Sequence, residues 1–199
     1  MPMSGFGPLS DTKARAVGIC AVALLALIAV AASIKAVPGP AGYLGAALAL
    51  LMLAIAAIDA RWFIIPDQLS AAGLALGLTN AAVIAPLEMW QAAGIALARG
   101  AVLALLFYAL RALYRRLRGR QGIGLGDVKL AAVAGAWLDW QTMPIAVEIA
   151  ALAALGVIGI RYYASGRPLD TALKFPFGLF LAPSIWMCWL LEATLLAPR

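Results

Sequence analysis

The chain consists of long apolar stretches separated by short polar ones. Five stretches carry at most one charged residue each, at 16–34, 36–58, 68–87, 89–110 and 175–191. Each approaches the ~20 residues that an α-helix needs to cross about 30 Å of hydrocarbon. The pattern therefore predicts membrane-spanning helices at these five places.

The region 130–160 is also apolar but is too long for one spanning helix. Asp139 begins a polar segment that ends near Pro144, and such a segment is typical of a turn. A turn there divides the region in two, and residues 128–138 become the shortest segment. We therefore expect an all-α polytopic membrane protein with about seven transmembrane segments.

Composition supports a membrane environment for the whole chain. Of the 199 residues, 65% are hydrophobic and 12% are charged, and the mean hydropathy is +0.97. A soluble domain of this size cannot bury so much apolar surface. Because no polar block is long enough for a second domain, residues 1–199 are interpreted as a single membrane domain with the lipid bilayer as its partner.

The net charge of +6 raises the question of nucleic acid binding, but the positions of the basic residues argue against it. Eleven of the 15 are Lys13, Arg15, Arg61, Arg111, Arg115, Arg116, Arg118, Arg120, Arg161, Arg167 and Lys174. With seven spans these residues share one side, and Lys35 and Arg199 are left on the other. Basic loops face the cytoplasm, so we expect a multi-pass protein of the inner membrane with a cytoplasmic N-terminus.

Two alternatives stay open for these basic and N-terminal segments. The cluster 111–120 is also suited to binding acidic lipid head groups. The stretch 16–34 resembles a cleaved signal peptide, although its uncharged core exceeds the usual length and favours a retained helix.

Several kinds of site are excluded by residue type. The chain has no histidine, which excludes Ser-His hydrolases and His-ligated metalloproteases. Its two cysteines, Cys20 and Cys188, both lie inside apolar segments, so we expect neither a disulfide nor a metal site. No cofactor is expected.

The informative residues are carboxylates at segment ends. Asp11, Glu88, Asp170 and Glu192 are assigned to loops or ends, where solvation explains them, and Asp139 is assigned to the turn. Asp59 closes the second segment and Asp127 opens the fifth, so seven spans place both at one membrane depth. Two facing carboxylates share a proton, which is the chemistry of aspartic proteases. The alternative is that both are simply interfacial.

Glycines and basic residues surround this pair. Gly122, Gly124 and Gly126 precede Asp127 and permit a close backbone approach. Arg61 and Lys129 each lie two residues beyond an aspartate, where they would tune the pair or bind substrate carbonyls. A flexible loop followed by an N-cap is the simpler interpretation of the glycines, and a P-loop is excluded because Gly-Lys-Ser/Thr is missing.

Arg99 and Glu148 lie inside apolar segments. Intramembrane charges are costly and usually paired, so the two are predicted to pair with each other. The equally supported alternative is that each extends separately to the outer interface.

Three segments resemble motifs of the type IV prepilin peptidase family, whose members are membrane aspartic proteases with a Gly-x-Gly-Asp motif. Residues 59–70 read Asp-Ala-Arg-Trp-Phe-Ile-Ile-Pro-Asp-Gln-Leu-Ser, 124–129 read Gly-Leu-Gly-Asp-Val-Lys, and 176–182 read Pro-Phe-Gly-Leu-Phe-Leu-Ala. The resemblance implies a six-helix peptidase core at 40–199, preceded by an additional N-terminal helix at 1–39.

The resemblance also implies the roles of individual residues. Asp59 and Asp127 would be catalytic, with Arg61, Gly124, Gly126 and Lys129 in support. Asp67 would not be catalytic, since the family often has asparagine at its position. Family members remove a short basic leader from pilin-like precursors at the cytoplasmic face, and the precursor's hydrophobic helix lies in the membrane.

Larger members also methylate the new N-terminus and carry paired Cys-x-x-Cys motifs, which this sequence lacks. Cleavage without methylation is therefore expected. The alternative from another functional class is a small ion- or proton-coupled transporter, or an assembly scaffold, in which the same carboxylates line a pathway. The lack of a visible inverted repeat weighs against the transporter.

Overall fold

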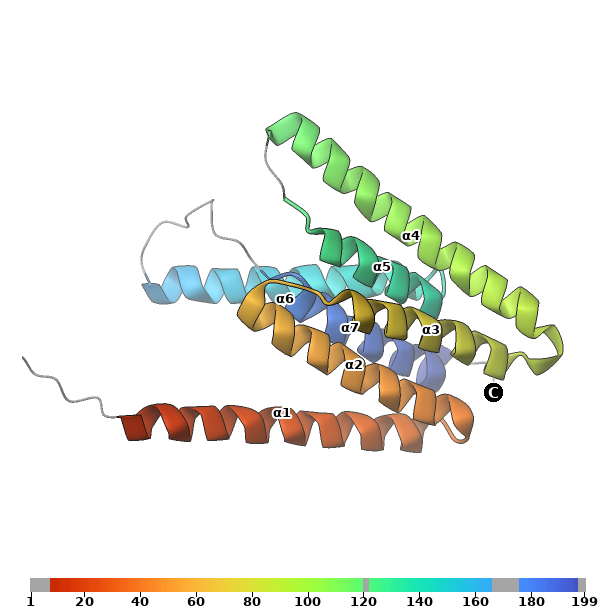
Figure 1. Ribbon diagram of the computed structural model, residues 1–199, viewed down its shortest axis with the longest axis horizontal. Coiled ribbons are helices and arrows are strands. Elements are labelled where there is room, and N and C mark those ends of the chain that lie inside the picture. Colours follow the sequence, from red (N-terminus) through yellow and green to blue (C-terminus); the bar gives the residue numbers. More distant parts are fainter. Residues whose placement is uncertain (1–7, 120–121, 166–175, 197–199) are drawn as a thin grey trace, which may run out of the picture.

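The computed structural model describes residues 8–119, 122–165 and 176–196, and these form helices joined by short turns (Figure 1). The α-helices are α1 (Pro8–Ala36), α2 (Pro40–Trp62), α3 (Asp67–Ile84), α4 (Met89–Arg118), α5 (Leu125–Trp137), α6 (Thr142–Ser165) and α7 (Gly178–Leu191). A short 3₁₀ helix, η1 (Pro86–Glu88), precedes α4, and a π-helical turn, η2 (Glu192–Leu196), follows α7. Each predicted segment contains one helix, so the all-α membrane fold is confirmed.

Within the described residues, five of the helices are long and apolar enough to cross a membrane. The candidate spans are Gly18–Ala36, Pro40–Trp62, Pro86–Arg118, Thr142–Ala164 and Gly178–Leu195. The other two are shorter or more polar: α3 has 18 residues and α5 has 13. At 1.5 Å per residue α5 is only about 20 Å long. The protein is therefore multi-pass, and the helix at 128–138 is the shortest, as predicted.

Successive helices run in alternating directions, so their ends gather at two opposite ends of the bundle (Figure 1). The aspartate end holds the last turns of α2, α4 and α6 and the first turns of α3, α5 and α7. The far end holds the last turns of α3, α5 and α7 and the first turns of α4 and α6. Arg61, Arg118 and Arg161 lie at the aspartate end, in agreement with the predicted charge segregation. Arg120, Arg167 and Lys174 are outside the described residues.

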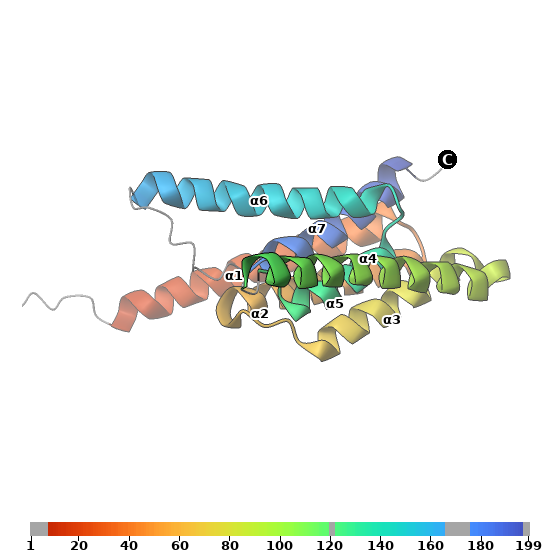
Figure 2. The same ribbon diagram turned by 90° about the horizontal axis from the view of Figure 1, so that it is seen from above.

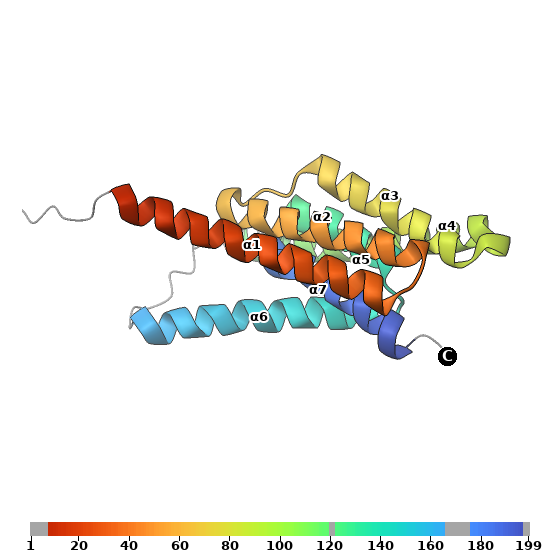
Figure 3. The ribbon, with the colours of Figure 1, turned by 90° about the horizontal axis from the view of Figure 1, so that it is seen from below.

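Helices α2, α5 and α7 form the centre of the bundle. Figure 2 shows α6 on one side of α7 and α3 on the opposite side, and Figure 3 shows α1 along the edge formed by α2. Met52, Leu130 and Leu181, one from each central helix, are fully buried. Close helix contact depends on small residues: a Cβ at Gly135 of α5 would lie 2.6 Å from the Arg99 carbonyl oxygen of α4. Van der Waals packing of this kind is the main attraction between helices in lipid.

The N-terminal helix α1 packs along α2 and is anchored near its C-terminus. Trp186 of α7 donates its indole N–H to the buried hydroxyl of Ser33 at 3.0 Å. Along its middle α1 exposes apolar residues such as Leu24 and Leu27, as expected for a lipid-facing surface. The division of the chain at 39/40 coincides with the turn between α1 and α2 and stays a prediction.

Two sequence-based assignments of charged residues were wrong. Arg99 does not pair with Glu148: its guanidinium contacts the carboxylate of Asp139, and Glu148 is exposed on α6. The turn after α5 brings Asp139 to Arg99, whereas Glu148 lies more than a turn into α6. Glu192 is not merely solvated at a chain end. It is half-buried and accepts hydrogen bonds from the Asp139 N–H, at 2.7 Å, and from the Thr142 hydroxyl.

Candidate active site

Asp59 lies in the last turns of α2 and is only 5% exposed. Its Oδ2 accepts a hydrogen bond of 3.0 Å from the backbone N–H of Leu179, at the start of α7. A Cβ at Gly178 would lie 2.8 Å from this oxygen. Glycine at 178 therefore lets the first turn of α7 approach Asp59 closely enough to donate the hydrogen bond.

The chain reverses immediately after Asp59. Phe63 caps α2 with a left-handed conformation, φ 55°, and its N–H bonds to the Asp59 carbonyl at 2.9 Å. Such a conformation is uncommon for a large residue. It bends the chain so that Ile65, 7% exposed, returns to the interior beside Asp59. Pro66, which cannot donate a backbone hydrogen bond, then begins α3 as its N-cap.

Ile65 joins the three motifs in space. A Cβ at Gly126 would lie 2.9 Å from the Ile65 Cβ, and a Cβ at Gly178 would lie 2.7 Å from its Cδ1. The absence of side chains at Gly126 and Gly178 therefore lets the Ile65 side chain pack directly against both backbones. Segments 59–70, 124–129 and 176–182, far apart in sequence, meet at this side chain.

Asp127 lies in the first turn of α5, three residues after the N-cap Gly124. Its Oδ2 accepts a hydrogen bond of 3.1 Å from the Gly124 N–H. Gly124 has no side chain to return a bond, so this contact is one half of a capping box. A carboxylate at this position also interacts favourably with the positive end of the helix dipole.

The two aspartates are close enough to affect each other's charge. Asp127 lies outside the five candidate spans and is half-buried. Burial raises the pKa of Asp127 from an ordinary 3.8 to about 6, and the negative charge of Asp59 contributes to the rise. The Gly124 N–H and the Arg111 guanidinium act in the opposite direction. Arg111 also donates to the Ile123 carbonyl at 2.9 Å, so α4 supports the loop that carries the glycines.

The predicted supporting residues have different surroundings. Lys129 forms an ion pair with Asp67, which joins α5 to the first turn of α3. Arg61 is exposed and, together with Ile58 and Trp62, lines a groove between α1 and α2. The described residues contain no group of three or more His, Cys, Asp or Glu side chains able to hold a metal ion.

Sequence reasoning missed the backbone donor at Leu179, because a main-chain N–H leaves no side-chain signature. It also gave no active-site role to Ile65 and Arg111. The motif at 176–182 was the only available indication of this donor. Because a third segment resembles the family, it could be expected to lie near the other two motifs. The structure brings that segment against Asp59.

Comparison with known proteins relates the chain to a family. Residues 46–159, more than half of the chain, match the model of the type IV leader peptidase family. The chain is 32% identical over 171 residues to the prepilin leader peptidase/N-methyltransferase of Aeromonas hydrophila, covering 84% of this chain and 56% of that protein. It is 37% identical over 163 residues to the protein of that name from Burkholderia pseudomallei, covering 79% and 50%.

The chain thus spans about half the length of these two relatives. A shorter relative, the leader peptidase HopD of Salmonella typhimurium, is 34% identical over 126 residues, which cover 62% of this chain and 77% of HopD. No solved structure matches the chain. With more than half of its residues matched by the family model and its three motifs gathered around Ile65, the chain belongs to the type IV leader peptidase family.

Proposed function

We propose that this protein is an integral-membrane aspartic endopeptidase that removes the N-terminal leader from type IV prepilin-like precursors, with Asp59 and Asp127 as the catalytic pair. The observation that carries the proposal is the convergence of three separate motifs on Ile65, which packs against Gly126, the neighbour of Asp127, and against Gly178, which lies against Asp59. A structural role for one aspartate would not require the other two motifs. Family membership supports the peptidase class.

In the proposed reaction the pair shares one proton. The ionised carboxylate takes a proton from a water molecule, whose oxygen attacks the scissile carbonyl carbon. The protonated carboxyl donates to the carbonyl oxygen. The tetrahedral intermediate collapses when the leaving nitrogen gains a proton, giving a leader carboxylate and a new N-terminal amine. The two acids titrate as a coupled unit, so neither is assigned a fixed role.

The proposed site is at the end of the bundle that carries Arg61, Arg111 and Arg118. Under the positive-inside rule this end faces the cytoplasm of an inner-membrane protein, which gives a cytoplasmic N-terminus. A precursor would present its leader there while its hydrophobic helix stays in the bilayer beside the enzyme.

The decisive experiment is co-expression with a pilin-like precursor, followed by measurement of the mature fraction. Asp59→Asn and Asp127→Asn are expected to lower the cleavage rate by roughly 10³-fold or more. Asp67→Asn is the matched control, because Asp67 is a neighbouring carboxylate at the same end with an exposed partner. Mature pilin at wild-type levels from either catalytic variant would contradict the mechanism.

The proposal extends to cleavage alone, without methylation of the new N-terminus. The two cysteines of the chain support this, because they do not form the Cys-x-x-Cys motif of the larger, methylating members. Cys20 is exposed on α1 and Cys188 is buried in α7. Mass spectrometry of the mature pilin is expected to find an unmethylated terminus when this chain is the only peptidase in the cell. A methylated product under those conditions would overturn this part.

A small transporter or scaffold remains the contrasting hypothesis for the same carboxylates. Proton flux into liposomes that is abolished by Asp59→Asn, without any precursor cleavage, would favour it. Membership of a peptidase family is what favours the enzyme.

A further inference from the structure

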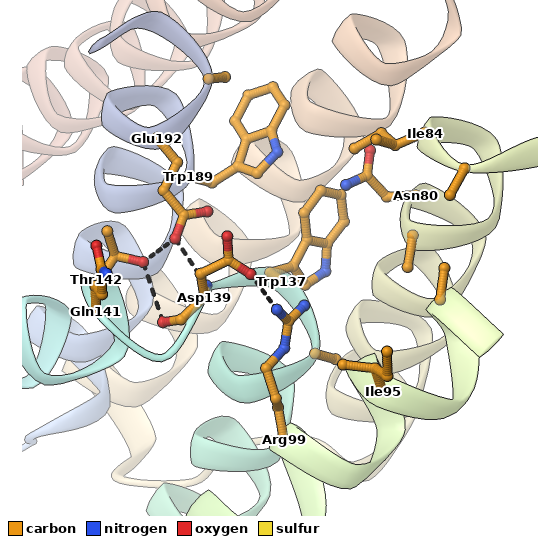
Figure 4. Close-up of a pocket in the computed structure, with 15 residues that line it drawn as sticks. Asn80, Ile84, Ile95, Arg99, Trp137, Asp139, Gln141, Thr142, Trp189 and Glu192 are labelled. Atoms are coloured by element: carbon orange, nitrogen blue, oxygen red, sulfur yellow. Dashed lines mark hydrogen bonds and ion pairs between the residues drawn. The ribbon is translucent and has the colours of Figure 1, made fainter. Parts of the chain in front are cut away.

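The short helix α5, which carries Asp127, is held at both of its ends by arginines of its neighbour α4. Arg111 donates to the carbonyl of Ile123, two residues before α5 begins, and Arg99 pairs with Asp139, two residues after α5 ends. Figure 4 shows the second contact, at the far end of the bundle. Because α5 has only 13 residues and lies outside the five candidate spans, its position depends on contacts with neighbouring helices.

The contact at the aspartate end acts on the peptide unit that holds Asp127. Arg111 donates to the Ile123 carbonyl at 2.9 Å, and the N–H of the next residue, Gly124, donates to Asp127 Oδ2 at 3.1 Å. The carbonyl of Ile123 and the N–H of Gly124 belong to the same peptide unit. Since that unit is planar, fixing its carbonyl also fixes the direction of its N–H. Arg111 is therefore linked to the Asp127 carboxylate through one rigid group.

A second residue of α4 contacts the same loop. Tyr114 lies three positions after Arg111, on the same face of the helix. A Cβ at Gly122 would lie 2.5 Å from the Tyr114 ring, so the ring packs directly against the backbone of the loop. Arg111 itself is half-buried. Membrane topology requires basic residues at this end of the bundle, but it does not require one that points inward and donates to a loop carbonyl.

The charges around Asp127 give Arg111 a second effect on it. Burial raises the pKa of Asp127 and the Gly124 N–H lowers it; Asp59 of α2 then raises it and Arg111 of α4 lowers it. Lys129 of α5 is engaged in an ion pair with Asp67 of α3. The described first turn of α7 contains no ionisable side chain. The other basic residues whose side chains are described at this end are exposed: Arg61, Arg115, Arg116, Arg118 and Arg161.

We infer that Arg111 is a positioning residue for Asp127, acting through the peptide unit between Ile123 and Gly124. It holds the carbonyl of that unit, so that the N–H on the other side stays directed at Asp127 Oδ2. Its charge also offsets that of Asp59, which helps the pair to keep one ionised carboxylate. A guanidinium suits both tasks because it is planar and always charged. The catalytic consequence of this inference rests on the proposed peptidase function, whereas the effect on Asp127 itself does not.

The first test requires no catalysis and uses the detergent-purified full chain. The midpoint of thermal unfolding of Asp127→Asn is compared, from about pH 4 to about pH 8, with that of the chain that keeps Asp127. The difference is expected to widen with pH and to level off above about pH 6. In an Arg111→Met background it is expected to become larger and to level off at a higher pH, because loss of the cation raises the pKa of Asp127 in the folded state.

Four further variants show whether this change is specific. Arg111→Gln removes the same charge with a polar side chain and is expected to behave like Arg111→Met, so a folding defect of one substitution does not decide the result. Arg111→Lys keeps the charge and is expected to restore the wild-type pH dependence. Arg99→Met removes the arginine at the other end of α5, so it should lower the midpoint without changing the pH dependence. Arg115→Met, at an exposed position one turn beyond Arg111, should change neither.

The second test is precursor cleavage. Arg111→Met is expected to lower kcat about tenfold, less than the roughly 10²-fold loss for a catalytic group displaced by 1 Å. KM should stay close to the wild-type value, because Arg111 contacts the loop, and Arg111→Lys should recover part of kcat. A raised KM with unchanged kcat would overturn the inference by making Arg111 a substrate contact.

The two tests separate this inference from the proposed function. If the wild-type chain cleaves no precursor, the proposed function fails, and the pH dependence of unfolding still decides the role of Arg111. If the wild-type chain cleaves the precursor but Arg111→Met and Arg111→Gln both keep the wild-type pH dependence, the inference about Arg111 fails and the proposed function stands.

Discussion

The two ends of the bundle hold their carboxylates in different ways. At the aspartate end, Asp59 and Asp127 each accept a hydrogen bond from a backbone N–H supplied by the first turn of a helix. At the far end, Asp139 contacts a guanidinium and Glu192 accepts from a hydroxyl and a backbone N–H. Backbone donors fix a carboxylate without neutralising it, whereas Arg99 neutralises its partner.

This difference separates a site suited to proton transfer from a cluster built around an internal ion pair. A carboxylate with a raised pKa can exchange a proton near neutral pH, and Asp127 meets this condition. At the far end, by contrast, the Asp139 carboxylate is held in an ion pair with Arg99. Variants at one end therefore test the comparison. A variant at the aspartate end should change precursor cleavage, and a variant at the far end should change stability alone.

Among variants that leave both catalytic carboxylates in place, the largest expected effect is on catalysis, from Gly178→Ala. The new Cβ would meet Asp59 Oδ2 at 2.8 Å and Ile65 Cδ1 at 2.7 Å, so the carboxylate must move. Because displacement of a catalytic group by about 1 Å costs roughly 10²-fold, kcat/KM for precursor cleavage is expected to fall by about that factor. Gly156→Ala, whose Cβ meets nothing within 4 Å, is the control. Equal activity of the two variants would contradict the proposed position of Asp59.

The next largest effect is a loss of stability, from Gly45→Ala at the far end of the bundle. A Cβ at Gly45 of α2 would lie 1.8 Å from the Trp189 ring, and that ring packs against Trp137. Overpacking of this kind costs about 1–3 kcal/mol. Gly45→Ala is expected to lower the midpoint of thermal unfolding, while the protein that stays folded keeps its kcat/KM. Gly94→Ala, in open space on α4, should leave both unchanged.

The third effect is the pH dependence of stability in Asp127→Asn. The folded state raises the pKa of Asp127 from 3.8 to about 6. The protonated acid is therefore favoured by folding, and this stabilisation is lost as the pH rises through about 6. Asparagine is neutral throughout, so the variant is expected to unfold at a higher temperature than the wild type above pH 6. The two curves should converge below about pH 4; parallel curves across this range would contradict the raised pKa.

The smallest effect is expected from the Lys129–Asp67 ion pair. Both side chains are largely exposed, at 43% and 75%, and exposed pairs contribute about 0–1 kcal/mol. Lys129→Met, Asp67→Asn and the double variant are expected to change cleavage only a few-fold. A double-mutant cycle with a coupling energy above about 1 kcal/mol would give the pair a larger role than its exposure suggests.

The sequence predicted the helices well, because an apolar stretch that crosses a membrane must satisfy its backbone hydrogen bonds internally, and an α-helix does so. It also placed Asp59 and Asp127 at one end, since one lies near the end of its helix and the other near the start of a helix that runs in the opposite direction. The turn at Asp139 was predicted correctly from its polar residues. These successes depend on the length and apolar character of each segment and on its polar breaks, which are local properties.

The failures concern contacts between distant helices. Arg99 was expected near Glu148, but depth in the membrane alone does not decide which neighbour a helix face meets. Glu192 was assigned to a solvated end, whereas its carboxylate reaches Thr142 and the Asp139 N–H in the fold. Leu179 could not be identified as a donor from its side chain. Such contacts depend on helix rotation, which a single sequence does not specify.

The hydrogen bond from Leu179 to Asp59 joins residues 120 positions apart, and this separation has a consequence for biosynthesis. At about 5–20 residues per second, translation reaches the donor roughly 6–24 s after the acceptor. Until α7 has been inserted, the nascent chain contains both aspartates but lacks the N–H that holds Asp59. We therefore expect a chain truncated before residue 176 to have no proteolytic activity, so that the cell receives an active protease only after the last helix is in the membrane.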